Sequence, residues 1–147
     1  MHEISQLVPH DGAMSWLDRV VEEGDEHLVA EATIRADHLL LRDGALSAAA
    51  GIEYMAQAVA AWAGAQRVRQ GSEPKIGFLL GTRRYQCERA RFAVGERLVV
   101  SVRRTFQADN GLGQFDARID IDGQAIASAS LNVFGPEDPE AFLASQE

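Results

Sequence analysis

Residues 48–69 read AAAGIEYMAQAVAAWAGAQRVR, a stretch without proline that decides the fold. Most of these residues are good helix formers, and apolar residues fall on nearly every side of the helix that they predict. Ser47 is a suitable N-cap, and Gly71 lies just beyond the end of the segment. Alanine rather than leucine dominates, and Glu53 and Gln57 interrupt the apolar surface. We therefore expect a long buried helix from Ala48 to Arg69 and not a membrane span.

Strand-like segments lie on both sides of this helix. Before it, residues 15–23 and 27–34 flank Gly24-Asp25, and apolar residues alternate in the second run, which predicts a hairpin. Residues 35–46 have no sustained period and predict a loop. After the helix, alternation predicts about four strands, with a strong two-residue turn at Asp122-Gly123. These later segments are residues 75–86, 97–107, 115–121 and 125–133.

This order of two strands, one long helix and about four antiparallel strands predicts an α+β protein. An antiparallel sheet wrapped around one central helix is the hotdog fold. A length of 147 residues predicts one such domain, spanning residues 1–147. Because one sheet rarely covers such a helix completely, we expect the protein to form at least a dimer.

The composition narrows the function classes. The polar opening MHEISQLVPH predicts no signal peptide, so we expect a cytoplasmic protein. The single cysteine, Cys87, allows no internal disulfide and no thiolate metal site, and we expect no metal. Only about fourteen residues precede the first predicted strand, too few for a helix-turn-helix, so we expect no nucleic-acid partner.

Charge is unevenly distributed along the chain, whose net charge is -8. Residues 67–104 hold ten basic and three acidic side chains, whereas residues 1–66 hold three basic and eleven acidic ones and residues 105–147 hold one and eight. The basic middle segment is either a docking surface for an anionic partner or a solvated face paired with nearby acids.

Two side chains could perform acid–base chemistry. Glu53 lies in an apolar helix, where burial favours the neutral acid, and Gln57 shares its helix face at the i, i+4 spacing. His38 lies in the loop before the helix, and imidazole is the usual general base near neutral pH. The alternatives are a solvated or Arg-bound carboxylate and an inert loop histidine. Free backbone N–H groups at the helix start could bind an oxyanion.

Three stretches of the chain resemble the FabZ-type 3-hydroxyacyl-acyl-carrier-protein dehydratases. LVPHDGAMSWLDRV is similar to the family's LxPHRxPxLxxDRV opening, and GIEYMAQ is similar to its E-A-M-A-Q helix. IGFLLGTRRYQCERARFAVGERLVVSV resembles its F/Y-L-x-G, R-F and G-D/E-x-L positions. In place of the family's HFPGxPxxPG this chain has HLLLRDGALSA, without the prolines and with one extra residue between His38 and Glu53. That departure resembles the divergent ApeP-like branch of aryl-polyene and related clusters.

The resemblance implies a dehydratase that converts 3-hydroxyacyl thioesters on an acyl carrier protein to trans-2-enoyl thioesters in fatty-acid, polyketide or aryl-polyene biosynthesis. It implies that His38 of one subunit removes the C2 proton and Glu53 of the other protonates the leaving hydroxyl, with Gln57 orienting Glu53. No cofactor is implied beyond the carrier's phosphopantetheine, and the partners implied are the carrier protein and a second hotdog subunit, identical or different. The resemblance also implies two further sets of residues. Those that bind the oxyanion and the acyl chain are Ala48, Ala49, Tyr54, Phe78 and Leu80, and those that dock the carrier protein are Arg83 and Arg84.

Two other functions remain open. A hotdog thioesterase would use the helix carboxylate to direct water at the thioester carbonyl and would not need His38. A non-catalytic acyl-thioester binder or partner subunit would be consistent with the loss of the proline loop.

Overall fold

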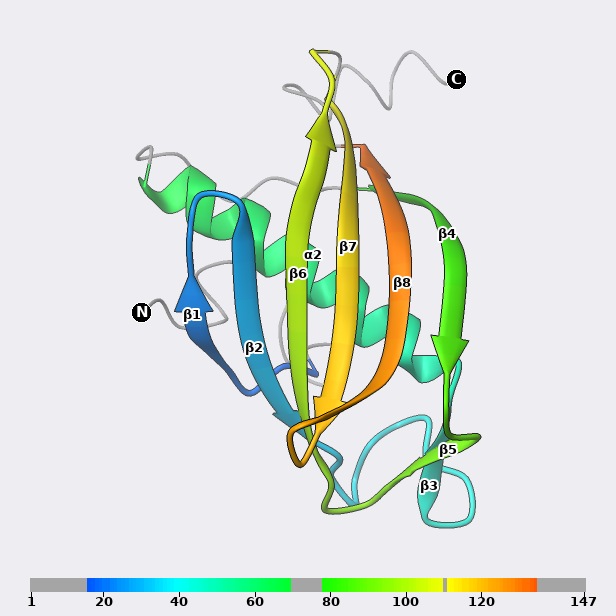
Figure 1. Cartoon of the computed structure of the whole chain (residues 1–147). Helices are drawn as coiled ribbons and strands as arrows, with labels where there is room; N and C mark the ends of the chain where they lie inside the picture. The colour runs from blue at the N-terminus through cyan, green and yellow to red at the C-terminus, as the bar shows by residue number, and fades with distance from the viewer. Residues whose placement is uncertain (1–15, 70–77, 110, 135–147) are drawn as a thin grey trace, which may run out of the picture.

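The computed structural model describes residues 16–69, 78–109 and 111–134 (Figure 1). A six-stranded antiparallel sheet, in the order β1-β2-β6-β7-β8-β4, forms one layer, and helix α2 lies across one face of it. β3 and β5 pair as a separate two-stranded sheet at one end. The elements are β1 (Arg19–Glu23), β2 (His27–Thr33), β3 (Ala45–Ser47), α2 (Ala50–Arg69), β4 (Phe78–Cys87), β5 (Arg91–Ala93), β6 (Arg97–Gln107), β7 (Leu112–Ile121) and β8 (Gln124–Phe134).

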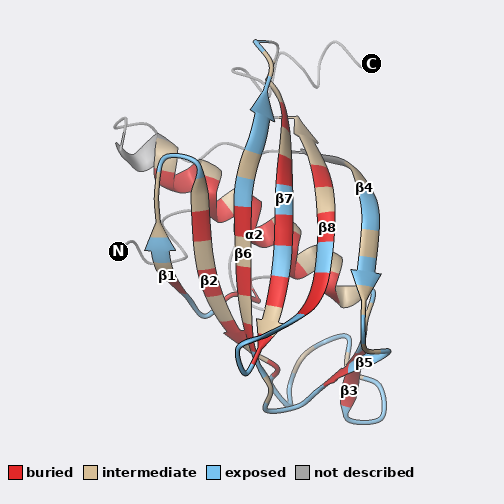
Figure 2. Ribbon diagram, viewed as in Figure 1, coloured by how far each residue is buried: buried red, intermediate tan, exposed pale blue. Residues whose placement is uncertain are grey.

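Burial alternates along the central strands, and the buried residues face α2 (Figure 2). On β2, for example, Leu28, Ala30 and Ala32 are inaccessible to solvent, whereas the residues between them are half-buried. This period of two is what a sheet with one covered face requires. The prediction of an α+β hotdog fold from the alternation and the single long helix is confirmed.

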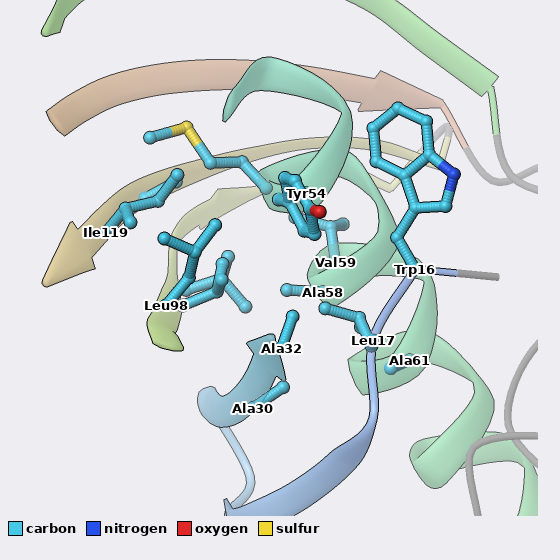
Figure 3. Close-up of a cluster of buried hydrophobic side chains, with 14 of the residues drawn as sticks. Trp16, Leu17, Ala30, Ala32, Tyr54, Ala58, Val59, Ala61, Leu98 and Ile119 are labelled. Carbon is cyan, nitrogen blue, oxygen red and sulfur yellow. The ribbon is translucent and has the colours of Figure 1, made fainter. Parts of the chain in front are cut away.

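The hydrophobic core lies between α2 and the sheet, where their apolar side chains pack together (Figure 3). Tyr54, Met55 and Ala58 on the helix are fully buried, together with Leu98 and Ile119 from the strands. Small alanine side chains let the helix approach the sheet closely, and each large apolar side chain in the contact contributes about 1.5–3 kcal/mol of burial free energy. No helix among the described residues is long and apolar enough to cross a membrane.

The predicted hairpin turn between β7 and β8 is confirmed. Asp122 has a φ of 53° and Gly123 a φ of 79°. Two successive residues of positive φ are what a two-residue turn of the primed type needs, because it matches the twist of the flanking strands.

Several predicted boundaries need correction. α2 begins at Ala50 and not at Ala48, because residues 48 and 49 form a turn in which the N–H of Ala49 donates to Ser47 Oγ at 3.2 Å. The predicted loop of residues 35–46 ends in β3, which pairs with β5. The predicted strand of residues 75–86 is β4, from Phe78 to Cys87; residues 75–77 lie outside the described residues.

Candidate active site

Gln57 and Glu53 form a hydrogen-bonded pair on α2. Gln57 is buried, and its Nε2 donates to Glu53 Oε1 at 3.1 Å. The backbone N–H of Trp16 donates to Gln57 Oε1 at 2.8 Å. Because the amide oxygen of Gln57 receives this bond, the amide group presents its NH₂ to the carboxyl of Glu53. The pair therefore shares one helix face, as the i, i+4 spacing predicts, and Gln57 holds the Glu53 carboxyl in one orientation.

His38 lies in the turn between β2 and β3, with its ring against the edge of the core. The centroids of the His38 and Trp16 rings are 4.3 Å apart, and the Tyr54 ring lies 6.4 Å from His38. Burial lowers the pKa of His38, and the nearby Asp37 opposes this shift only in part. Burial thus favours the neutral imidazole.

A backbone bond defines the proton position on that neutral ring. The N–H of Leu40 donates to His38 Nδ1 at 3.1 Å. A nitrogen that accepts a hydrogen bond carries no proton, so in the neutral ring the proton is on Nε2. His38 Nε2 is buried and has no hydrogen-bond partner among the residues that the structure describes.

Tyr54 and Trp16 complete an aromatic cluster around His38. Their ring centroids are 5.0 Å apart, and Figure 3 shows the two side chains next to each other. Burial raises the pKa of Tyr54, so its hydroxyl keeps its proton. Like His38 Nε2, the Tyr54 hydroxyl and Trp16 Nε1 are buried without a hydrogen-bond partner in the described part of the chain.

The backbone donors predicted at the helix start are engaged elsewhere. The N–H of Ala48 donates to the carbonyl of Ala90 at 2.9 Å, and that of Ala49 donates to Ser47 Oγ. The carbonyl of Ala48 accepts from the Tyr85 hydroxyl at 2.5 Å. Neither N–H is therefore open toward a ligand, which departs from the predicted oxyanion site.

His38 and Glu53 are joined only indirectly. No hydrogen bond links their side chains in the residues described by the structure. Trp16 contacts His38 through its ring and Gln57 through its backbone N–H, and Gln57 in turn contacts Glu53. The resemblance pairs these residues across two subunits, whereas this connection lies within one chain. Trp16 is not among the site residues predicted from the sequence.

Other predicted site residues are placed only in part. Phe78 and Leu80 belong to β4, but their side chains lie outside the described residues, as does the whole of His10. The predicted roles of Phe78 and Leu80 in substrate binding stay predictions.

Arg83 and Arg84 are exposed on β4, where the pairing with β8 is interrupted by a bulge. Arg84 has a φ of 57°, which is uncommon for a residue with a side chain, and bulges often redirect a side chain in this way. Arg84 lines a groove of about 570 Å³ on the sheet face away from α2, together with Arg103 and Arg118. Asp116 also lines the groove, opposite Arg103.

Small hydroxyl side chains of β6 and β8 also line this groove, on either side of Arg118 and Asp116 of β7. They are Ser101, Ser128 and Ser130. The groove and the Glu53–Gln57 pair therefore lie on opposite faces of the sheet.

Comparison with known proteins gives a family match over nearly the whole chain. The model of the ApeP-like family, described as ApeP dehydratase, matches residues 2–144. A search of curated proteins finds no match. Among solved structures, the dehydratase heterocomplex ApeI:P from Xenorhabdus doucetiae has a TM-score of 0.90 and 26% identity, covering 100% of this chain and 99% of that one.

More distant structures share the fold alone. A hypothetical thioesterase from Streptococcus pneumoniae, solved with coenzyme A, has a TM-score of 0.62 and 13% identity, over 80% of this chain and 84% of that one. The PaaI protein of the phenylacetic acid degradation operon of E. coli has a TM-score of 0.62 and 14% identity, over 78% and 80%.

Proposed function

This chain belongs to the ApeP-like dehydratase family, as its resemblance to that branch predicted, and we propose that it dehydrates 3-hydroxyacyl thioesters to trans-2-enoyl thioesters. The observation that carries the proposal is the Glu53–Gln57 pair. A carboxyl held on an apolar helix by a buried amide is suited to repeated proton transfer, because its position and its hydrogen bonds are set before the substrate arrives.

The reaction needs a group that removes the C2 proton, a group that protonates the departing C3 hydroxyl, and donors for the thioester oxygen. Glu53 supplies a carboxyl group, and His38 supplies an imidazole, which Trp16 links to the Glu53–Gln57 pair. We propose these residues, with Tyr54, as the polar part of the site. We propose that the reaction needs no cofactor beyond the phosphopantetheine that carries the substrate.

We further propose that the substrate arrives on an acyl carrier protein, which docks at the exposed Arg83 and Arg84 on the edge strand β4. A guanidinium group suits both phosphate and carboxylate geometry. The substitution Arg84→Glu is then expected to raise KM severalfold for a carrier-bound substrate and to leave KM for a short pantetheine mimic unchanged. Arg97→Glu, an exposed arginine of β6 outside the groove, is the matched control. Equal effects of both variants would contradict docking at Arg83 and Arg84.

A hetero-oligomer with a second hotdog subunit is the assembly that we propose, because the similar structure from Xenorhabdus doucetiae is a dehydratase heterocomplex. We propose that the second subunit pairs with the free edge of β4. This strand has 10 residues and pairs only with β8 in the described sheet, whereas the other edge strand, β1, has 5 residues. A long strand with one unpaired edge is a template for strand addition.

The test is an assay of enoyl absorbance and of released thiol on a 3-hydroxyacyl thioester, with the chain alone and with its hotdog partner. Glu53→Gln keeps the size of the side chain but cannot transfer the proton, so we expect enoyl formation to fall at least about 100-fold. Glu88→Gln, at an exposed glutamate, is the control and should leave the rate unchanged. Thiol release without enoyl product would instead identify a thioesterase, and no product in either form would identify a non-catalytic subunit.

A further inference from the structure

Three buried polar atoms without partners lie in one aromatic cluster. Trp16 Nε1, His38 Nε2 and the Tyr54 hydroxyl lack a hydrogen bond in the described residues, and their rings contact one another at centroid distances of 4.3, 5.0 and 6.4 Å. Buried polar groups are nearly always hydrogen-bonded, because each one left unpaired is costly. Three in one place indicate a site that is completed by a ligand.

The chemistry of these atoms defines the ligand. Indole Nε1–H can only donate, and the Leu40 N–H at Nδ1 makes His38 Nε2 a donor in the neutral ring. The Tyr54 hydroxyl remains protonated and can donate as well. A set of donors without a fixed acceptor binds an oxygen atom that carries or develops negative charge.

The cluster is near the surface and is connected to the Glu53–Gln57 pair through Trp16. Leu39 and Leu40, which follow His38, are exposed, so the cluster lies directly beneath the surface of this loop. Trp16 also donates its backbone N–H to Gln57, which holds Glu53. Trp16 is therefore part of the donor cluster and also contacts the amide group that holds Glu53.

We propose that Trp16 Nε1, His38 Nε2 and the Tyr54 hydroxyl bind the thioester carbonyl oxygen of the substrate, and that His38 acts there as a neutral hydrogen-bond donor and not as the base. This inference rests on the proposed dehydration and changes the role that the resemblance gives His38. It also supplies donors in place of the N–H groups of Ala48 and Ala49, which are engaged within the chain.

Glu53 then performs both proton transfers of the dehydration. Its carboxylate takes the C2 proton, and the electrons of the C2–H bond form an enolate whose charge lies on the thioester oxygen in the donor cluster. As the C2=C3 double bond forms, the C3–O bond breaks with its electron pair on oxygen. That oxygen takes the same proton back from Glu53 and leaves as water, so the carboxylate is restored.

The first test needs no activity. Imidazole ¹⁵N shifts of the folded protein, assigned by loss of signals in His38→Gln, report which nitrogen of His38 carries the proton. We expect Nε2–H at neutral pH. A proton on Nδ1 would overturn the inference, whatever the enzyme proves to catalyse.

Binding is tested with the amide analogue of a 3-hydroxyacyl pantetheine thioester, which keeps the carbonyl and cannot be cleaved. The chain has two tryptophans, so Trp62→Phe assigns the Trp16 indole N–H signal. We expect the analogue to shift this signal downfield and to leave the Trp62 signal in place. Saturation of the protein with no shift at Trp16 would show that the cluster holds no substrate oxygen.

Kinetics distinguish the two roles of His38. Glutamine places a donor near the position of Nε2, so His38→Gln should stay within about tenfold of wild-type kcat, whereas His38→Ala should lose about 100-fold. A histidine acting as base would lose about the same factor in both variants. Tyr54→Phe should lower kcat about 100-fold with little change in KM, and Trp62→Phe is the matched aromatic control. If wild type forms no enoyl product, the proposed function fails, and the two spectroscopic results still decide the donor site.

Discussion

Gly51 is expected to tolerate alanine only when Tyr85 has lost its hydroxyl group. A Cβ at position 51 would lie 2.3 Å from the Tyr85 hydroxyl oxygen, which donates to the carbonyl of Ala48. Gly51 is in the first turn of α2, where alanine otherwise gains roughly 0.5–1 kcal/mol of helix propensity. Against this gain, displacement of the hydroxyl costs about 1–3 kcal/mol of strain and about 1 kcal/mol of lost hydrogen bonding. Gly51→Ala should therefore lower the free energy of unfolding by about 1–3.5 kcal/mol.

The sign of this effect should change in a Tyr85→Phe background. Without the hydroxyl, the nearest atoms to the new Cβ are Ile119 Cδ1 and Tyr85 Cζ, each at 3.3 Å, which small adjustments can accommodate. Gly51→Ala should then be neutral or raise the free energy of unfolding by up to about 1 kcal/mol, because only the propensity gain remains. The coupling free energy of the two substitutions is therefore about 2–4 kcal/mol.

Urea unfolding of wild type, both single variants and the double variant measures this coupling. All four must be compared at one protein concentration, because association would add to apparent stability. If Gly51→Ala destabilises the Tyr85→Phe protein as much as it destabilises wild type, then the hydroxyl is not what excludes a side chain at position 51.

Three further predictions concern a turn, a tryptophan and a histidine. Gly123→Ala should lower the free energy of unfolding by about 1 kcal/mol, because Gly123 has a φ of 79°; urea unfolding measures the change. Trp62→Phe should cost about 1–2 kcal/mol in the same assay, because it removes the hydrogen bond from Trp62 Nε1 to the carbonyl of Gly24 and leaves that group without this donor. Burial lowers the pKa of His38, so the unfolded chain binds more protons there, and stability should fall as the pH drops below about 6.5. His38→Gln should reduce the change of the urea midpoint with pH between about pH 7 and pH 5.5. If the midpoint of this variant depends on pH as steeply as that of wild type, the buried neutral imidazole is contradicted.

The larger elements could be predicted because their signals are long. The apolar, alanine-rich helix and the alternating strands of the β7–β8 hairpin each repeat their pattern over several periods, and Asp122-Gly123 has the turn chemistry that its backbone requires. β3 and β5 have three residues each, which is too short for alternation to be recognised. Their pairing depends on chain segments that only the folded sheet brings together.

The only part of the site that the sequence could predict is the contact between two residues on the same helix face. Glu53 and Gln57 are four residues apart on one helix, so their contact follows from the spacing. The contacts of Trp16 with His38 and Gln57 join residues that are 22 and 41 positions apart, in the segment before β1, the loop before β3 and helix α2. Composition gave no reason to separate Trp16 from an ordinary core residue, because its polar atom is visible as unpaired only when the packing is known.

The altered loop after His38 has a direct chemical consequence. In the pattern HFPGxPxxPG, the second residue after the histidine is proline, which has no backbone N–H to donate. In this chain that position is Leu40, and its N–H is the group that donates to His38 Nδ1. The loss of this proline is therefore what allows the loop to hold the imidazole proton on Nε2. Leu40→Pro should remove that bond and release the ring to carry its proton on Nδ1, which the imidazole ¹⁵N shifts would report. If the shifts do not change, another contact holds the proton on Nε2, and the sequence of the loop is not its cause.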